Sequence, residues 1–151
     1  LSCTMLIGTQ AVFAPADRAA LRTAINACIN EPGTGGDDLY SGGDGSCPNF
    51  AISNDDTGNP YGAIGDWDVS AVTAMNDLLG KKFFNADISK WNTGAVTTMS
   101  RLFTWAEAFN SDVSKWNTGA VTDMIYSKCD NSSSFIVSQF SHVLFFFIFV
   151  L

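Results

Sequence analysis

The sequence has few basic residues and only one histidine. Lysine and arginine total 8 against 15 acidic residues, and the formal net charge is −7. Nucleic acid and anionic membrane surfaces both require clustered positive charge, whereas these basic residues are scattered along the chain. The composition therefore disfavours both partners. The histidine, His142, lies in a phenylalanine-rich run without an acidic neighbour, so we interpret it as structural or incidental.

Motifs of the common enzyme classes are also missing. The chain contains no G-x-S-x-G, no P-loop and no H-E-x-x-H, and no second histidine that could act as a general base. Asp66 and Asp68 form a close pair of carboxylates, but we expect them on a surface turn without a cleft. The sequence therefore predicts a non-enzymatic protein that needs no cofactor.

Cysteines are few, and their spacing does not predict a metal site. Without a C-x-x-C pair, a zinc site of Cys and His ligands is disfavoured. The acidic run around Asp44 does not match a calcium loop, so we predict no metal. Cys28 and Cys47 flank a Gly- and Asp-rich loop with little core of its own. A disulfide there would stabilise the fold by about 3 kcal/mol; the alternative is two reduced, half-buried thiols.

The N-terminal part divides into two predicted segments. Residues 1–14 are either the remnant of a signal peptide or the start of a record inside a longer gene. Residues 15–60 are expected to form a cap, with a helix over 15–29 followed by the loop 31–60. The helix has a proline suited to its first turn and an apolar face, made by Leu21, Ile25 and Cys28.

From residue 61 the sequence repeats. FNADISKWNTGAVTTM at 84–99 returns as FNSDVSKWNTGAVTDM at 109–124. The same spacing of 24 or 25 residues relates three sets of apolar residues: Trp67, Trp91 and Trp116; Val72, Val96 and Val121; Met75, Met99 and Met124. A short period of this kind is typical of repeats that stack to share one core, as in leucine-rich repeats.

Each repeat combines two periodicities. In FNADIS, residues 84–89, apolar and polar positions alternate, which predicts a strand. From Val96 to Ala106 the apolar residues follow a period of 3.6, which predicts a short helix capped by Thr97. In the preceding copy Gly80 is expected to end the helix. We therefore predict an α/β repeat of strand, turn and short helix, with a buried tryptophan at each corner.

The polar positions of the predicted strands form a column on the solvent face. This column is either an ordinary solvated surface or a binding surface for a ligand or cation. Its members are Asn85, Asp87, Ser89, Asn110, Asp112 and Ser114.

The repeats resemble the BspA-type leucine-rich repeat surface proteins, which include a repeat domain of unknown function first described in mycoplasma proteins. The matching segments are YGAIGDWDVSAVTAM, FNADISKWNTGAVTTMSRLFTWAEAFNSDVSKW and NTGAVTDM, within Tyr61–Met124. The resemblance implies a right-handed solenoid over residues 61–128 with an N-terminal capping helix. It also implies secretion or surface display, and binding or adhesion rather than catalysis.

After Met124 the pattern stops. Residues 129–151 form an apolar tail, in which Phe135–Leu151 carries no charge over 17 residues, close to the lower limit for a membrane span. The tail is a membrane anchor, an artefactual end of the gene model, or a β-rich end packed on the last repeat. Asn131 begins a glycosylation sequon that is usable if the protein is exported.

Together these features predict an extracellular or cell-surface module that binds a protein or a glycan. The alternative is a structural spacer, or a truncated fragment of a longer repeat array, without a binding role of its own.

Overall fold

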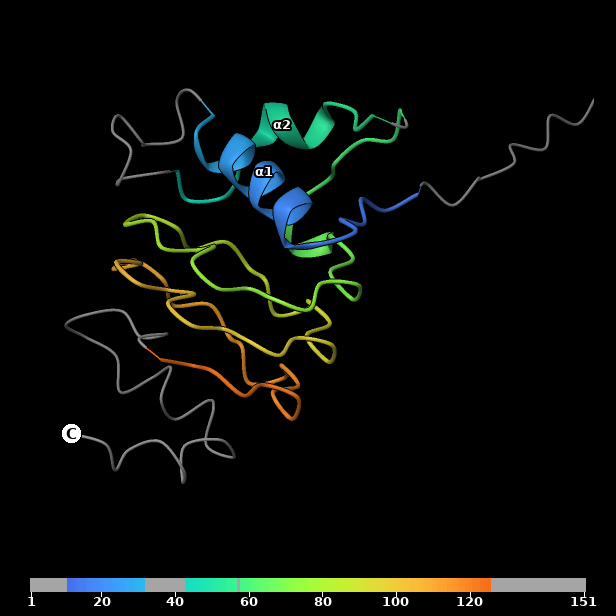
Figure 1. Cartoon of the computed structure of the whole chain (residues 1–151). Coiled ribbons are helices and arrows are strands. Elements are labelled where there is room, and N and C mark those ends of the chain that lie inside the picture. Colours follow the sequence, from blue (N-terminus) through green and yellow to red (C-terminus); the bar gives the residue numbers. More distant parts are fainter. Residues whose placement is uncertain (1–10, 32–42, 57, 126–151) are drawn as a thin grey trace, which may run out of the picture.

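The computed structural model describes residues 11–31, 43–56 and 58–125. The elements are two α-helices, α1 (Arg18–Ile29) and α2 (Pro48–Ile52), and one 3₁₀ turn, η1 (Ile64–Asp66). The helices lie side by side at one end of the molecule, and the remaining chain winds below them in stacked layers (Figure 1). We call the described residues up to 63 the cap, and residues 64–125 the layers.

Helix α1 is present where the sequence predicts one, although it begins at Arg18 because Asp17 caps it. The Asp17 side chain accepts a hydrogen bond from the backbone N–H of Ala20 at 2.9 Å. The predicted apolar face is buried. Arg18 joins α1 to the layers, since its Nε and Nη2 donate to the carbonyl oxygen of Asn76 at 3.0 and 2.7 Å.

The cap is closed by two further links. The predicted disulfide between Cys28 and Cys47 is present and joins the end of α1 to the start of α2. Glu31, a buried residue, accepts hydrogen bonds from the backbone N–H groups of Asn49 and Phe50, both at 3.0 Å. Burial raises the pKa of Glu31, but these hydrogen bonds outweigh it and leave the pKa below its usual value.

The predicted α/β solenoid of strand, turn and short helix is wrong. Among the described residues there is no strand and no sheet, and no helix lies between residues 67 and 125. The layers consist of turns and bends. The β-type pairing between them, within the described residues, is limited to two isolated parallel bridges, Ala74 with Thr98 and Thr98 with Asp123.

The prediction of helices in the repeats failed because their backbone bonds to the next layer. The N–H groups of Met75, Asp77 and Leu79 donate to the carbonyls of the residues 23 positions later, Thr98, Ser100 and Leu102, at 2.9 to 3.1 Å. An N–H used in this way cannot close a helical turn. The apolar spacing that suggested a helical face arises from a bent chain.

Particular residues bend and join these segments. Asp77 and Arg101 have φ values of 56° and 55°, in the left-handed region that interrupts extended chain. Thr97 does not cap a helix, because its N–H and its hydroxyl both donate to the carbonyl oxygen of Thr73 in the previous layer. Gly80 lies where a Cβ would approach the Thr104 carbonyl oxygen to 2.5 Å, so its role is close packing rather than ending a helix.

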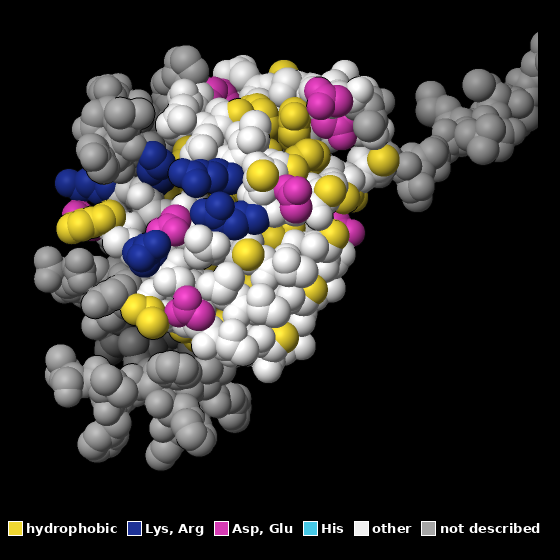
Figure 2. Space-filling model, in the orientation of Figure 1, with side chains coloured by type: hydrophobic (Ala, Val, Ile, Leu, Met, Phe, Trp, Pro, Cys, Tyr) yellow, Lys and Arg dark blue, Asp and Glu magenta, His cyan; other side chains and the backbone are white. Residues whose placement is uncertain are grey.

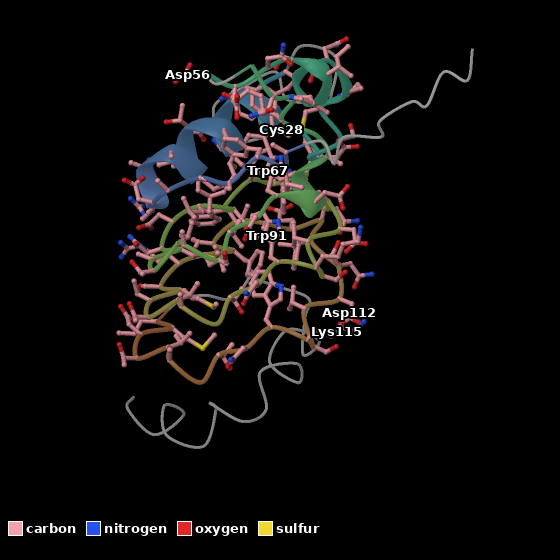
Figure 3. All side chains as sticks on the ribbon, turned by 90° about the vertical axis from the view of Figure 1, so that its right-hand side faces the viewer. Cys28, Asp56, Trp67, Trp91, Asp112 and Lys115 are labelled. Atoms are coloured by element: carbon pink, nitrogen blue, oxygen red, sulfur yellow. A yellow bond between two sulfur atoms is a disulfide. The ribbon has the colours of Figure 1, made fainter. Side chains whose placement is uncertain are left out.

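The core runs through the stack, and tryptophans anchor it as predicted. Trp91 donates its indole N–H to the carbonyl of Ile64 at 2.8 Å, and Trp116 donates to Ile88 at 3.1 Å. The rings of Trp91 and Trp116 stack at 6.2 Å, and Figure 3 shows Trp67 directly above Trp91. The residues predicted for the core of one repeat are all buried: Phe84, Ile88, Trp91, Val96 and Met99.

Several expectations fall outside the described residues: residues 1–10 of the signal remnant, the tail 129–151 with Phe135–Leu151, the sequon at Asn131, and His142. Within residues 11–31, 43–56 and 58–125, neither helix has the length and apolar character needed to cross a membrane.

Candidate binding edge

The polar column predicted from the repeats lies on the surface of the layers. Asn85 and Asp87 are exposed, whereas Phe84 and Ile88 beside them are buried. In the next copy Asn110, Asp112 and Ser114 are exposed as well, and Ser89 is half-buried. The chain therefore alternates its side chains between core and solvent even though it forms no strand.

The two aspartates of the column hold the turns that follow them. Oδ1 of Asp87 accepts a hydrogen bond from the N–H of Ser89 at 3.0 Å, and Oδ1 of Asp112 accepts one from Ser114 at 2.9 Å. These backbone hydrogen bonds are the main reason why the pKa of each aspartate lies below its usual value. Both carboxylates are therefore ionised at neutral pH and part of the local structure.

The asparagine of the column connects two layers. Oδ1 of Asn85 accepts from the N–H of Asn110 at 2.7 Å, so these equivalent residues touch. Beside them, the hydroxyl of Ser111 donates to the carbonyl of Ala86 at 2.8 Å. Part of the predicted binding column is thus engaged in holding the stack together.

Lysines alternate with the aspartates along this side of the stack. Lys90 forms an ion pair with Asp66 of the previous layer at 2.7 Å, and this hydrogen bond raises the pKa of Lys90. Lys115 lies close enough to both Asp87 and Asp112 to lower the pKa of each. Figure 3 shows Asp112 and Lys115 together at one margin of the molecule. We call this surface the charged edge; its members are Asp66, Asp87, Lys90, Asp112 and Lys115.

An open hollow of about 430 Å³ lies where the charged edge meets the cap. Residues 44–46 form one wall, residues 63–66 another, and residues 85–87 with Lys90 complete it. No group of three His, Cys, Asp or Glu side chains that could hold a metal occurs within the described parts of the chain. The hollow offers carboxylates, an ammonium group and an amide, which suit hydrogen bonding to a polar ligand.

One exposed aromatic residue was missed by the sequence reasoning. Trp105 is 60% exposed and has a φ of 71°, a conformation that costs a non-glycine residue on the order of 1–3 kcal/mol. The chain has four tryptophans, and Trp105 is the one outside the 24- or 25-residue spacing. Its position outside this spacing could have predicted its exposure, because only the tryptophans that follow the repeat fill a corner of the core.

The comparisons with known proteins give a family and nothing finer. Residues 50–139 match the family described as "Mycoplasma protein of unknown function, DUF285". The match begins within α2 and includes all of the layers, whereas α1 lies before it. Neither a curated protein nor a solved structure matches this sequence. The finer resemblance to BspA-type leucine-rich repeat proteins is not confirmed by the family match.

Proposed function

We propose a non-enzymatic binding role for this chain, which belongs to the mycoplasma-type family DUF285. The protein acts outside the cell or at its surface, and the charged edge and the polar column bind a protein or a glycan. The observation that carries the proposal is the alternation of exposed carboxylates and ammonium groups along one side of the stack. Such a surface presents hydrogen-bond acceptors and donors at regular intervals to an extended polar partner.

Two features support the extracellular, non-enzymatic form of this role. The disulfide between Cys28 and Cys47 is of a kind that persists in oxidising compartments. The pKa values of Asp87 and Asp112 are lowered by hydrogen bonds, whereas a catalytic general acid needs a raised pKa near neutrality. These carboxylates are therefore suited to recognition more than to proton transfer.

The alternative role, a structural spacer or a fragment of a longer array, is favoured by a different observation. Asn85 and Ser111 bond to the adjacent layer, and the aspartates hold turns. If the polar residues served only to form these hydrogen bonds, removing the charges of the edge while keeping the hydrogen bonds would leave the affinity for every partner unchanged.

The experiment that separates the two roles uses substitutions that spare the turns. Asp87→Asn/Asp112→Asn removes both negative charges but keeps an oxygen that can accept the serine N–H. We would screen the wild-type chain on an array of neutral and acidic glycans and on a panel of purified extracellular proteins. For a partner bound at this edge, the Asn variant should lose at least tenfold in affinity.

The control is Asp56→Asn, which makes the same kind of change at an exposed aspartate of the cap and should leave binding at the edge unchanged. Urea unfolding would verify that both variants remain folded. Binding of every partner equally by wild type and by Asp87→Asn/Asp112→Asn would refute the role of the edge and favour the spacer.

A further inference from the structure

A second surface, away from the charged edge, gathers positive charge on this acidic protein. Figure 2 shows most of the visible Lys and Arg side chains together on one side of the face, where α1 meets the layers. Lys90 and Lys115 belong to the charged edge. We call the other Lys and Arg residues of the described parts of the chain the basic face: Arg18, Arg22, Lys81, Lys82 and Arg101.

Contacts between the cap and the layers bring these residues together. Arg18 donates to the carbonyl of Asn76, and the next residue, Asp77, forms an ion pair with Arg101 at 2.6 Å. Arg22 follows Arg18 by one turn of α1, on the same side of the helix. Residues far apart in the sequence thus form one surface, which explains why their clustering is not visible in the sequence.

The loops beside this surface carry exposed aromatic rings. Phe83 is 41% exposed, and the Lys82 ammonium lies 5.7 Å from the centre of its ring. Lys82 also pairs with Glu107 at 3.6 Å, and the Glu107 N–H donates to the carbonyl of Trp105. Trp105, with its left-handed backbone and exposed indole, therefore stands at the margin of the basic face.

We propose that the basic face binds an acidic polysaccharide, with Trp105 stacking on a sugar ring and the Arg and Lys side chains pairing with sulfate or carboxylate groups. This site is separate from the charged edge of the proposed function. Exposed guanidinium and ammonium groups pair with such anions. An indole offers a flat apolar surface with one polar group, which suits the C–H face of a sugar.

The arrangement of charges favours a polysaccharide over a nucleic acid. Asp77 and Glu107 lie within the basic face, and Asp123 is close enough to Arg101 to raise its pKa. A DNA duplex carries one negative charge per 1.7 Å of axis and would meet these carboxylates with repulsion. A polysaccharide spaces its charges more widely, and its hydroxyl groups can donate hydrogen bonds to the carboxylates. The disulfide also indicates an exported protein.

The test measures binding of the full chain to dextran sulfate as the sulfated probe and to hyaluronan as the carboxylated probe, with dextran as the neutral reference. At 50 mM salt the wild type should bind at least one acidic probe and not dextran. Which acidic probe binds more tightly identifies sulfate or carboxylate as the group recognised. Raising the salt concentration should weaken the binding steeply, because ion pairing with the polymer releases counterions.

Two double variants with the same loss of charge provide the comparison. Arg22→Gln/Lys82→Gln changes the basic face, and Lys90→Gln/Lys115→Gln changes the charged edge; each pair includes one lysine that forms an ion pair. The first should lose five- to tenfold in affinity and show a weaker salt dependence. The second should stay within twofold of the wild type. Equal losses in both variants would overturn the assignment to this face.

Trp105→Ala tests the stacking contact separately. It should lose about fivefold in affinity for the acidic polysaccharide with an unchanged salt dependence, because no charge is removed. An unchanged affinity would overturn the role of the indole. No binding of either acidic probe by the wild type, or tighter binding of a DNA duplex than of both, would overturn the polysaccharide proposal, even if the charged edge binds its own partner.

Discussion

The cap and the layers of this protein are stabilised in different ways. In the cap, α1 supplies its own backbone hydrogen bonds, and a disulfide and a buried carboxylate link it to α2. In the layers, residues 64–125, only one three-residue turn is regular, and backbone groups of one layer bond to residues 23 to 26 positions away in the next. The cap is locally defined, whereas each layer takes its structure from its neighbours.

This difference explains what the layers require of their side chains. A turn without regular secondary structure leaves many backbone groups that need partners, and the adjacent layer supplies them at fixed positions. Tryptophans and threonines bond across layers at those positions, and glycines allow the chains to approach. The sequence repeats because each layer must place the same kinds of residue at the same positions as the layer beside it.

The largest predicted effect is on the layers. Trp91→Ala removes a buried indole, its hydrogen bond to Ile64 and its stacking on Trp116. Large aromatic residues cost about 3–5 kcal/mol when truncated in a core, so we expect unfolding or a loss of that size in urea denaturation. Trp105→Ala, at an exposed position, should change stability by less than about 1 kcal/mol. Similar losses in both variants would contradict the assigned core.

The next effect concerns the cap. Cys28→Ser/Cys47→Ser removes the link between α1 and α2, whose cysteines are 19 positions apart. The chain-entropy model gives a loss of about 3 kcal/mol, measurable as a lower urea midpoint. Reducing the wild type should reproduce this loss, whereas the reductant should leave the double variant unaffected. A reduced wild type as stable as the oxidised one would show that the layers, rather than the disulfide, hold the cap.

Sequence analysis was correct for features that depend on which side chains are buried. The core positions of the repeats, the presence of a helix within residues 15–29 and the cysteine pair followed from apolar spacing and from the Gly- and Asp-rich loop between the cysteines. It failed on the secondary structure of the repeats. A 3.6-residue spacing does not distinguish a helix from a bent chain whose N–H groups bond elsewhere, and residues such as Arg101 carry no sequence signal for a left-handed conformation.

The candidate surfaces show the same limit. The exposed positions of the polar column could be predicted, because alternation around buried Phe84 and Ile88 fixes which side chains face solvent. Their hydrogen bonds to the next layer could not. The basic face was missed entirely, since Arg18 and Arg101 become neighbours only when the cap packs on the layers through Asn76 and Asp77.

A smaller effect tests the close approach of the layers. A Cβ at Gly65 would lie 2.0 Å from the carbonyl oxygen of Asp87, so Gly65→Ala must push two backbones apart. We expect a loss of about 1–3 kcal/mol, as for overpacked cores. Gly94→Ala is the control, because its nearest contact is a side-chain oxygen of Asn92 at 3.3 Å that can move. A loss at Gly94 as large as at Gly65 would indicate a general cost of alanine in these turns instead.

The smallest effect at neutral pH is expected for the aspartates that hold the turns of the layers. Asp68, Asp87 and Asp112 each accept a hydrogen bond from the N–H two residues later, and the pKa of each lies below its usual value. A carboxyl group with a lowered folded-state pKa contributes stability above its unfolded pKa of about 3.9. That contribution is lost as the pH falls through the folded pKa.

Wild-type stability should therefore decline below about pH 4. The triple Asp→Asn variant should be slightly less stable than the wild type near pH 7, because an amide oxygen is a weaker acceptor than a carboxylate. It should decline less as the pH falls, so that the two proteins converge in acid. The measurement is urea unfolding of both proteins from pH 2 to pH 7. If the stability of the two proteins falls in parallel with pH, the acid-sensitive carboxylates lie in the cap. Glu31 is then the first to test, because hydrogen bonds lower its pKa as well.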